Sequence, residues 1–306
     1  MPRLSAGKEA ALEEQGDSPL VSVVIPAYNE EAAIGEDLDK LKAAMDASPF
    51  SYEVIVVDDG SRDRTAAIVR ERPWVRLLQH AKNRGTGAAR NTGIEAARGE
   101  IIAMSDGDGT YPVQDIPKLV QFLLEGKHDM VIGARKREAG TMRLLRAPTK
   151  WFIRALACYL TQTSIPDLNS GLRVFRREPL LRFRKILPTT HSWVSTMTIA
   201  FLSEGLSVAW VPIDYYPRKG RSSFHPVRDT YNYLSLVVRT VMYFNPLRIF
   251  LPLTSVLLAV AILKLVRDFV HYQGFYVPAI TVLLFLTAIQ LGALGLLADL
   301  IVRRSG

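Results

Sequence analysis

Cysteine is almost absent from this chain of 306 residues. The one cysteine, Cys158, has no partner within the chain, so an internal disulfide is excluded. Because Cys158 stands in an apolar stretch, we interpret it as a small buried side chain. Histidine is also scarce, and its five copies are scattered, so we assign none of them a catalytic role.

Two common nucleotide-binding motifs are missing as well. The stretch KNRGTGAARN, residues 82–91, matches neither the phosphate loop of nucleoside triphosphatases nor the G-x-G-x-x-G fingerprint of dinucleotide enzymes. The chain has no internal repeat and no low-complexity tract. Its first 20 residues hold no apolar run of signal-peptide length, and we expect residues 1–19 to form a flexible, charged tail.

Positive charge is in excess, with a formal net charge of +8. Such a balance favours an anionic partner, for example a phosphorylated ligand or an anionic membrane surface. Much of the excess lies in the basic stretch that begins at residue 134 and beside the apolar runs at the end of the chain. We therefore predict no nucleic-acid partner.

Residues 21–134 repeat one pattern, in which an apolar run precedes a polar loop and an amphipathic stretch. The runs lie at residues 21–26, 52–59, 75–80, 100–106 and 128–134, and the helix-like stretches at 31–46, 63–71, 86–98 and 115–125. This alternation predicts an α/β fold with a Rossmann-like, mostly parallel sheet covered on both faces. Ligands of such sheets bind beyond the carboxyl ends of the strands. We expect the later residues 165–180 to form a turn-rich loop and residues 210–213 to belong to a strand.

The loop SDGDG, residues 105–109, places two carboxylates directly after an apolar run. Asp106 and Asp108 repel each other at close range, so the loop is either a solvated turn or a place where a cation binds. A carboxylate pair of this kind holds Mg²⁺ or Mn²⁺ when phosphate oxygens and water complete the coordination. Gly107 and Gly109 permit a close backbone approach.

Two further loops carry groups suited to a nucleotide. In VDDGS, residues 57–61, Asp58 or Asp59 is placed to accept a hydrogen bond from a base or a ribose, although the same pattern also suits a turn with a helix cap. The loop 82–91 gathers basic side chains and glycines at a predicted helix start, where backbone N–H groups bind phosphate. Its members are Lys82, Arg84, Gly85, Gly87 and Arg90.

Two long apolar runs, residues 249–266 and 275–298, stand near the end of the chain. Each is long enough to cross a bilayer, and the alternative is a buried helical hairpin. Arginines precede the first run and follow the second, which predicts a multi-pass membrane protein with both ends, and so the domain before the first run, in the cytoplasm. Residues 229–248 show helical spacing that is typical of an interfacial helix or of a core-packing one.

Four motifs together resemble family-2 glycosyltransferases of the GT-A fold: SVVIPAYNEE, VIVVDDGSRDRT, GTGAARNTGI and SDGDGTYPVQDIPKLV. The segments DLNSGLRVFRRE and PRKGRSSF, followed by two apolar runs, resemble the polyprenyl-phosphate glycosyltransferases, the group that includes dolichol-phosphate-mannose synthases. The resemblance implies a GT-A domain at 20–224, a juxtamembrane amphipathic helix at 225–247 and a transmembrane hairpin at 248–306, with spans at about 249–267 and 275–299.

The resemblance also implies roles for single residues. A UDP- or GDP-linked sugar would be the donor, and Asp106 and Asp108 would hold Mg²⁺ or Mn²⁺ beside it. Relatives often carry glutamine where this chain has Thr110. The implied donor-binding residues are Pro26, Ala27, Tyr28, Glu30, Asp58, Asp59, Arg84, Gly85, Arg90, Asp106, Gly107 and Asp108.

The implied acceptor is a polyprenyl phosphate held by a basic set of residues. This set comprises Arg135, Arg146 and Lys150, with Arg143 as an alternative to Arg146. Arg218, Arg221 and Ser222 would close over either the acceptor or the donor pyrophosphate. Arg135 and Arg146 would act with Asp106 and Asp108 in catalysis. Many relatives read G-x-S-K where this chain has Ser223. The basic loop after Gly133 also suits anionic lipid headgroups.

The implied reaction is an inverting transfer of sugar to the lipid phosphate. That phosphate is already ionised near neutral pH, since its second pKa is about 6, and needs no strong general base. Two other functions remain open: a membrane scaffold that binds a nucleotide sugar without turnover, and a relative of processive polysaccharide synthases, although no Q-x-x-R-W motif is present. The hairpin is too small for a translocation path, so moving the product calls for a homo-oligomer or a partner flippase.

Overall fold

The fold comes from a computed structural model. It describes residues 18–136, 155, 157–159, 161–189, 192–218, 238, 242, 243, 245–271 and 277–305. The expected tail therefore lies outside the described residues except for residues 18 and 19. The expected juxtamembrane helix also lies mostly outside them.

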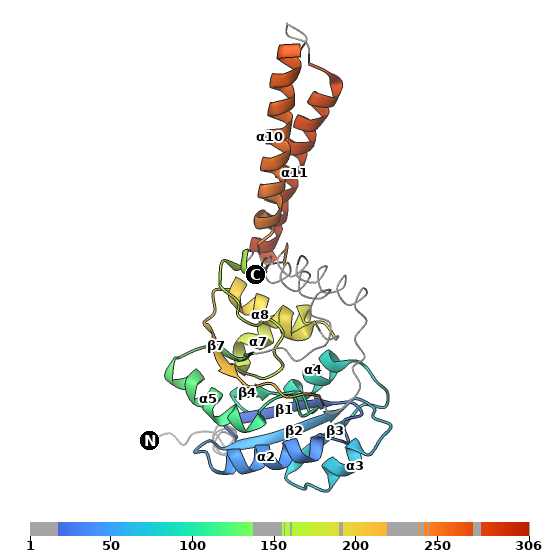
Figure 1. The fold of residues 1–306 in the computed structure, drawn as a ribbon, viewed down its shortest axis with the longest axis vertical. Coiled ribbons are helices and arrows are strands. Elements are labelled where there is room, and N and C mark those ends of the chain that lie inside the picture. Colours follow the sequence, from blue (N-terminus) through green and yellow to red (C-terminus); the bar gives the residue numbers. More distant parts are fainter. Residues whose placement is uncertain are drawn as a thin grey trace, which may run out of the picture.

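A seven-stranded sheet forms the centre of the described residues (Figure 1). Its strands are β1 Val21–Ala27, β2 Tyr52–Asp58, β3 Val75–Gln79, β4 Ile101–Met104, β5 Met130–Arg135, β6 Arg173–Arg176 and β7 Val208–Ile213. They lie in the order β3-β2-β1-β4-β6-β5-β7. Only β6 runs antiparallel to its neighbours, β4 and β5. The mostly parallel, Rossmann-like sheet is therefore confirmed.

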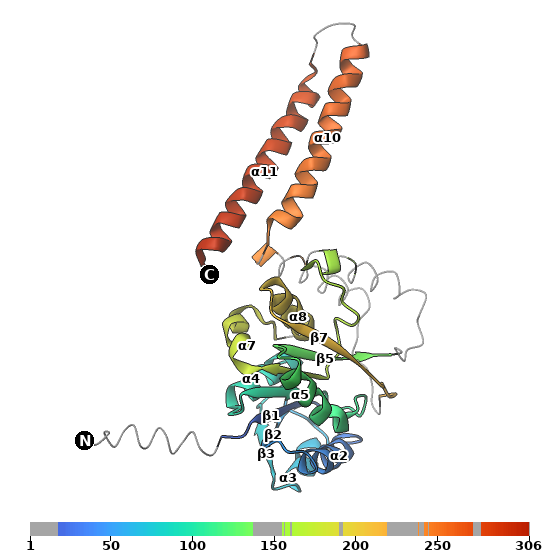
Figure 2. The same ribbon diagram turned by 90° about the vertical axis from the view of Figure 1, so that its left-hand side faces the viewer.

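Helices cover both faces of this sheet (Figure 2). They are α2 Ile34–Asp46, α3 Thr65–Arg70, α4 Thr86–Ala96, η1 Val113–Asp115, α5 Ile116–Glu125, α7 Arg177–Phe183, η2 Arg184–Ile186 and α8 Trp193–Ser203. Helices α2 and α5 pack on the face that carries Val23, and α4, α7 and α8 pack on the face that carries Val24. Because both faces are covered, β1 is buried along its whole length and its sequence is a continuous apolar run.

The first four helices confirm the predicted alternation. The helix-like stretches at 31–46, 63–71, 86–98 and 115–125 correspond to α2, α3, α4 and α5. In α2, the buried residues Ile34, Leu38, Leu41 and Met45 recur every three or four positions, which is the spacing of an amphipathic helix.

The prediction of a turn-rich loop over residues 165–180 is wrong in its second half. Residues 173–176 form β6, and α7 begins at Arg177. The strand escaped prediction because two of its four residues are arginines, and one of them, Arg173, is completely buried. The predicted strand at 210–213 is confirmed as the second half of β7.

Two long apolar helices, α10 Leu247–His271 and α11 Ala279–Ser305, extend away from the sheet as a hairpin (Figures 1 and 2). Both are long and apolar enough to cross a membrane, and only 6% and 17% of their most apolar windows are buried. This exposure contradicts the alternative of a hairpin buried in a core. The expected spans, 249–267 and 275–299, fall mostly within these helices, although α11 begins four residues later.

The base of the hairpin contacts the sheet domain. Ile249 packs against a small buried cluster that includes Ile165, Leu168 and Ile199. The first helix of the hairpin is therefore seated on the side of the domain that carries α8 (Figure 2).

Candidate active site

Acidic side chains from two neighbouring strands meet at the carboxyl end of the sheet. Strand β1 leads into Glu30, and strand β4 leads into Asp106 and Asp108. Because β1 and β4 are paired in parallel, their following loops lie side by side. Arg218, which follows β7, contacts both loops: its Nη2 lies 2.5 Å from Glu30 Oε1 and its Nε lies 3.5 Å from Asp108 Oδ2.

Asp106 is held on two sides. Arg90, a buried residue of α4, places Nη2 2.6 Å from Asp106 Oδ1, and its guanidinium lies 5.8 Å from the ring centre of Trp193. On the other side, a Cβ atom at Gly171 would overlap Asp106 Oδ2, so the backbone there passes directly against the carboxylate. Arg90 was expected to contact the donor, and its geometry favours a role in positioning Asp106.

Asp108 is bound within its own loop. The hydroxyl of Thr110 donates a hydrogen bond of 2.5 Å to Asp108 Oδ1, and the Thr110 backbone N–H donates another of 3.2 Å. Burial raises the pKa of Asp108, and the nearby charge of Asp106 raises it further. A divalent cation at this carboxylate would relieve both effects.

Glu30 shares this electrostatic environment. The pKa of Glu30 is raised to about 7. Burial is the largest cause, the contact with Arg218 acts in the opposite direction, and the charges of Asp108 and Asp106 add to the increase. Burial and repulsion between neighbouring acids therefore both disfavour the charged forms of Glu30 and Asp108. This is the condition that favours binding of a cation.

The carboxylates of this site fit a divalent cation whose remaining coordination positions are filled by a bound ligand. Among the described residues, no three His, Cys, Asp or Glu side chains are arranged to hold a metal ion alone. Asp106 and Asp108 offer carboxylate oxygens, which Mg²⁺ and Mn²⁺ prefer. Phosphate oxygens and water would fill the other positions, as expected for a nucleotide-dependent site.

One acidic residue beneath the site was missed by sequence reasoning. Asp37, in the first turn of α2, accepts a hydrogen bond of 2.9 Å from the backbone N–H of Gly109. Burial raises the pKa of Asp37 to about 6. The signal was present, because Asp37 stands three residues after Ile34 on the buried side of an amphipathic helix.

The predicted nucleotide-binding carboxylates Asp58 and Asp59 are buried and bonded internally. Asp58 accepts hydrogen bonds from the Ser61 backbone N–H, at 3.0 Å, and from Gln79, at 2.9 Å. Asp59 accepts from the backbone N–H groups of Arg84 and Gly85, at 2.9 and 2.8 Å. Both carboxylates thus shape the loops on this side of the site.

The other expected donor residues differ in exposure. Pro26 and Ala27 are buried in β1, whereas the Tyr28 side chain is partly exposed just beyond the strand. Arg84 is exposed, Gly85 begins α4 with a φ of 97°, and Gly107 is buried against Ile34. Tyr28 and Arg84 are the members of this group that offer exposed side chains to a ligand.

Arg135, at the end of β5, is held by a carboxylate that was not predicted. Its Nε lies 2.7 Å from Asp167 Oδ2 and its Nη2 lies 2.9 Å from Asp167 Oδ1, a two-point ion pair. Although burial opposes ionisation, the hydrogen bonds and charge of Arg135 hold the pKa of Asp167 below its ordinary value. The guanidinium also lies over the ring of Tyr215, 5.3 Å from its centre.

The loop that supplies Asp167 is braced by Arg173. This completely buried side chain donates hydrogen bonds to the carbonyl oxygens of Ser170 and Val194 and to the Thr198 hydroxyl. Burial lowers the pKa of Arg173 to about 9. The polar run D-x-N-S-G-x-R at 167–173 was the sequence signal for this arrangement.

Five of the predicted acceptor residues lie outside the described residues. They are Arg143, Arg146, Lys150, Arg221 and Ser222. Arg135 and Arg218 are described, and both stand at the carboxyl end of the sheet. Tyr215 packs edge-on against Tyr111, which follows the Asp108 loop, so the Arg135 region and the acidic cluster are joined through aromatic contact.

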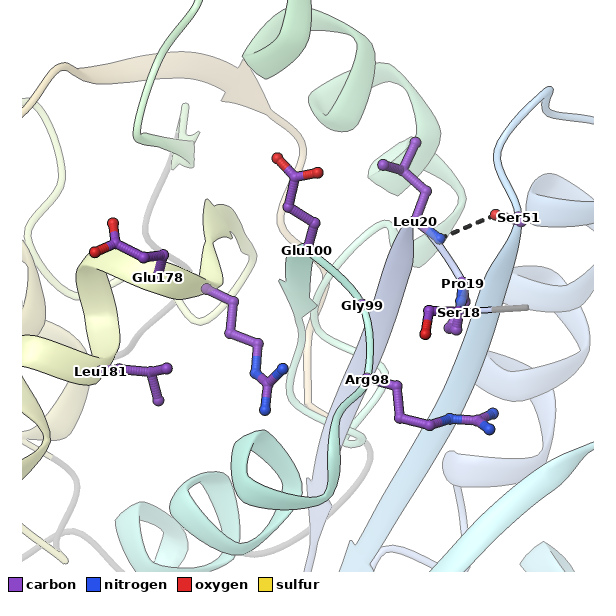
Figure 3. Close-up of a pocket in the computed structure, with 10 residues that line it drawn as sticks. Ser18, Pro19, Leu20, Ser51, Arg98, Gly99, Glu100, Glu178 and Leu181 are labelled. Atoms are coloured by element: carbon purple, nitrogen blue, oxygen red, sulfur yellow. Dashed lines mark hydrogen bonds between the residues drawn. The ribbon is translucent and has the colours of Figure 1, made fainter. Parts of the chain in front are cut away.

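A separate pocket of about 420 Å³ opens at the opposite end of the sheet (Figure 3). It is lined by residues that precede β1, β2 and β4, including Leu20, Ser51 and Glu100, and by residues of α7. Ligands of parallel sheets bind at the carboxyl ends of the strands. The acidic cluster lies at that end and this pocket does not, so the acidic cluster is the candidate site.

Comparison with known sequences matches both parts of the chain. Residues 22–183 match the family described as Glycosyl transferase family 2, and residues 245–303 match the one described as GtrB C-terminal hairpin. A dodecaprenyl-phosphate galacturonate synthase of Rhizobium johnstonii is 27% identical over 302 residues, covering 92% of this chain and 88% of that protein. A human dolichyl-phosphate beta-glucosyltransferase is 33% identical over 237 residues, covering 68% and 73%.

Solved structures show the same fold. Glucosyl-3-phosphoglycerate synthase from Mycobacterium tuberculosis, in complex with Mn²⁺, UDP and phosphoglyceric acid, superposes with a TM-score of 0.60 at 22% identity. The match covers 79% of this chain and 84% of that one. At this identity the likeness establishes a GT-A-like α/β domain and nothing about substrates.

Proposed function

Because the chain belongs to glycosyl transferase family 2, we propose that it transfers one sugar from a nucleoside-diphosphate sugar to a polyprenyl phosphate. One observation carries the proposal: Asp108 and Glu30 meet Arg218 at the carboxyl end of the sheet, in a chain that also has a GtrB-type hairpin. The acidic side suits a cation with a diphosphate, and the basic side suits a second phosphate.

The donor would lie over the ends of β1 and β4. Its diphosphate faces Asp106 and Asp108, which would hold Mg²⁺ or Mn²⁺, and its UDP or GDP base lies toward Tyr28 and Arg84. A bound cation would neutralise the charge that the departing diphosphate gains. Arg90 and the backbone at Gly171 keep Asp106 fixed, so the site needs little reorganisation during the reaction.

The acceptor phosphate would be drawn to the arginines beside the acidic cluster. Arg218 contacts the cluster and would face the donor diphosphate or the acceptor phosphate, and Arg135 is linked to the cluster through Tyr215 and Tyr111. Arg143, Arg146, Lys150, Arg221 and Ser222 are proposed from the sequence to complete the acceptor site. A phosphate monoester is ionised near pH 7, since its second pKa is about 6, so its oxygen attacks without a base. A single displacement then inverts the configuration of the sugar carbon.

The hairpin would keep the domain at the membrane surface, where the phosphate of a polyprenyl lipid lies. Arginines at residues 248, 303 and 304 stand at the ends of the two helices that face the domain. The excess of positive charge at these ends supports a cytoplasmic position for the catalytic domain and a multi-pass topology.

The test is direct transfer by the purified full-length chain. Protein in lipid nanodiscs is given undecaprenyl or dolichyl phosphate, Mn²⁺ and a panel of radiolabelled UDP- and GDP-sugars, and labelled glycolipid is extracted. We expect one donor to label the lipid and Asp108→Ala to abolish the label. Asp39→Asn changes an exposed acid on α2 and is the matched control. Donor binding without any labelled lipid across the whole panel would contradict the proposal and favour a scaffold.

A further inference from the structure

Arg218 binds Asp108, one of the two carboxylates proposed to hold the cation, and also the neighbouring carboxylate of Glu30. Its guanidinium contacts Glu30 Oε1 at 2.5 Å and Asp108 Oδ2 at 3.5 Å. The two acids are largely buried, with side chains 11% and 13% exposed, whereas Arg218 is 36% exposed. A partly exposed cationic side chain therefore pairs with two largely buried acids.

We propose that Arg218 competes with the divalent cation at Asp108, and that it exchanges Asp108 and Glu30 for the diphosphate of the donor. The inference rests on the proposed function and deepens it. A guanidinium and a divalent cation within a few ångströms of each other repel strongly in a partly buried site. Both cannot remain on Asp108 at once unless anionic phosphate oxygens lie between them.

Among the three acids, Glu30 and Asp108 depend most on this exchange. Asp106 already has a buried partner in Arg90, at 2.6 Å. Of the cations in the described residues, Arg218 is the one whose ion pairs reach both Glu30 and Asp108. When Arg218 moves away, these two carboxylates need another positive charge, and the cation that arrives with the donor supplies it.

The backbone just before Arg218 is anchored to the Asp108 loop, and the exchange needs only a rotation of the Arg218 side chain. The Tyr216 backbone N–H donates a hydrogen bond of 2.9 Å to the carbonyl oxygen of Thr110. Tyr215 packs edge-on against Tyr111, with ring centres 5.3 Å apart. Arg218 therefore follows, by two residues, a backbone contact with the Asp108 loop.

This arrangement makes cation affinity depend on the nucleotide. Without a nucleotide, the cation must displace Arg218 from two ion pairs, so binding is weakened. With a nucleoside diphosphate, Arg218 gains phosphate oxygens as new partners, and a guanidinium binds phosphate well. Removing Arg218 should then strengthen cation binding in the first case and weaken it in the second.

The test measures Mn²⁺ binding to the full-length chain in detergent micelles, through the electron paramagnetic resonance signal of free Mn²⁺. Arg218→Ala should bind Mn²⁺ about fivefold more tightly than the unchanged chain without nucleotide, the scale of one partly exposed ion pair. With saturating UDP, Arg218→Ala should bind Mn²⁺ less tightly than the unchanged chain. Arg182→Ala removes an exposed ion pair with Glu178 on α7 and should change neither affinity.

Two results would overturn the inference. Equal Mn²⁺ affinity of Arg218→Ala and the unchanged chain without UDP would show that Arg218 does not compete. If Arg218→Ala raised the Mn²⁺ affinity equally with and without UDP, the effect would be only the loss of a nearby positive charge, and Arg218 would not move to the diphosphate. Arg218→Gln, checked for folding by its melting temperature, repeats the test if the alanine variant is unstable. This binding test uses no acceptor and measures no transfer. Its outcome is therefore independent of whether the chain has the proposed transferase activity.

Discussion

Arg90 Nη2 lies 2.6 Å from Asp106 Oδ1, in an ion pair that joins α4 to the loop after β4. The Arg90 side chain is only 5% exposed, and its guanidinium is stacked near Trp193. Gly171 closes the opposite side of the carboxylate. Asp106 is therefore set in place by the fold itself, which is what a preorganised cation site requires.

Gly171→Ala should disturb Asp106 without a change of charge. The new Cβ would overlap the carboxylate, so either the loop or Asp106 must shift. A displacement of this size costs on the order of 10-fold to 100-fold in kcat/KM, measured as glycolipid formed at low donor concentration. Gly205→Ala is the control, because its Cβ meets nothing within 4 Å. Its φ of 72° should cost about 1 kcal/mol of stability and leave transfer unchanged. Full activity in Gly171→Ala would show that the position of Asp106 is not critical.

Asp167→Asn should weaken use of the lipid acceptor. The substitution keeps the shape of the side chain but removes the charge that orients Arg135 through two hydrogen bonds. We expect the KM for polyprenyl phosphate to rise about tenfold, the cost of one charged hydrogen bond, while the KM for the donor stays constant. Lys42→Ala, which removes an exposed pair with Asp46 at 2.7 Å on α2, should alter neither constant. An effect of Asp167→Asn on the donor alone would contradict the placement of Arg135.

Asp37→Asn should stabilise the chain at high pH. Burial raises the pKa of Asp37 from 3.8 to about 6, so the folded state holds its proton more tightly than the unfolded state. The stability due to this group is therefore complete below pH 3.8 and is lost as the pH rises to about 6. Asparagine keeps an acceptor for Gly109 and has no charge to bury. The melting temperature of the variant should match that of the unchanged chain near pH 4 and exceed it at pH 8. A gain of equal size at both values would rule out titration of Asp37 as the cause.

The hairpin should be more sensitive at Gly295 than at Gly292. A Cβ at Gly295 would lie 2.6 Å from Phe250 Cβ, whereas one at Gly292 would lie 3.3 Å from the nearest atom of Thr254. Gly295→Ala must therefore separate α10 from α11 near the sheet domain, and overpacking of this kind costs about 1–3 kcal/mol. We expect a lower melting temperature in detergent for Gly295→Ala and little change for Gly292→Ala. Equal melting temperatures for the two variants would mean that the helices are not so closely packed.

Much of the sheet and the acidic loop could be predicted because their causes are local. Strands β1 and β4, and β2 from Val54 onward, are buried on both faces, so each is a largely apolar run followed by a polar loop. Parallel pairing then brings those loops to the carboxyl end of the sheet, where ligands are expected to bind. The two long apolar helices follow from their length and composition.

The remaining features depend on contacts between distant parts of the chain. Strand β6 has a buried arginine that donates hydrogen bonds to acceptors in the loop before the strand and in α8. The sequence of β6 therefore lacks the apolar pattern of a buried strand. The pairs of Arg90 with Asp106 and of Arg135 with Asp167 join segments 16 and 32 residues apart. Sequence patterns identify these arginines as basic residues near phosphate sites, but they do not show which acids hold them.

The most direct measurement follows glycolipid formation while divalent cations are removed and returned. Full-length protein, donor and polyprenyl phosphate are incubated with EDTA in excess, and Mn²⁺ is then added above the EDTA concentration. The account predicts that transfer stops with EDTA, resumes with Mn²⁺, and does not resume in Asp108→Asn. Transfer that continued at its full rate with all divalent cations chelated would contradict a cation held at Asp106 and Asp108.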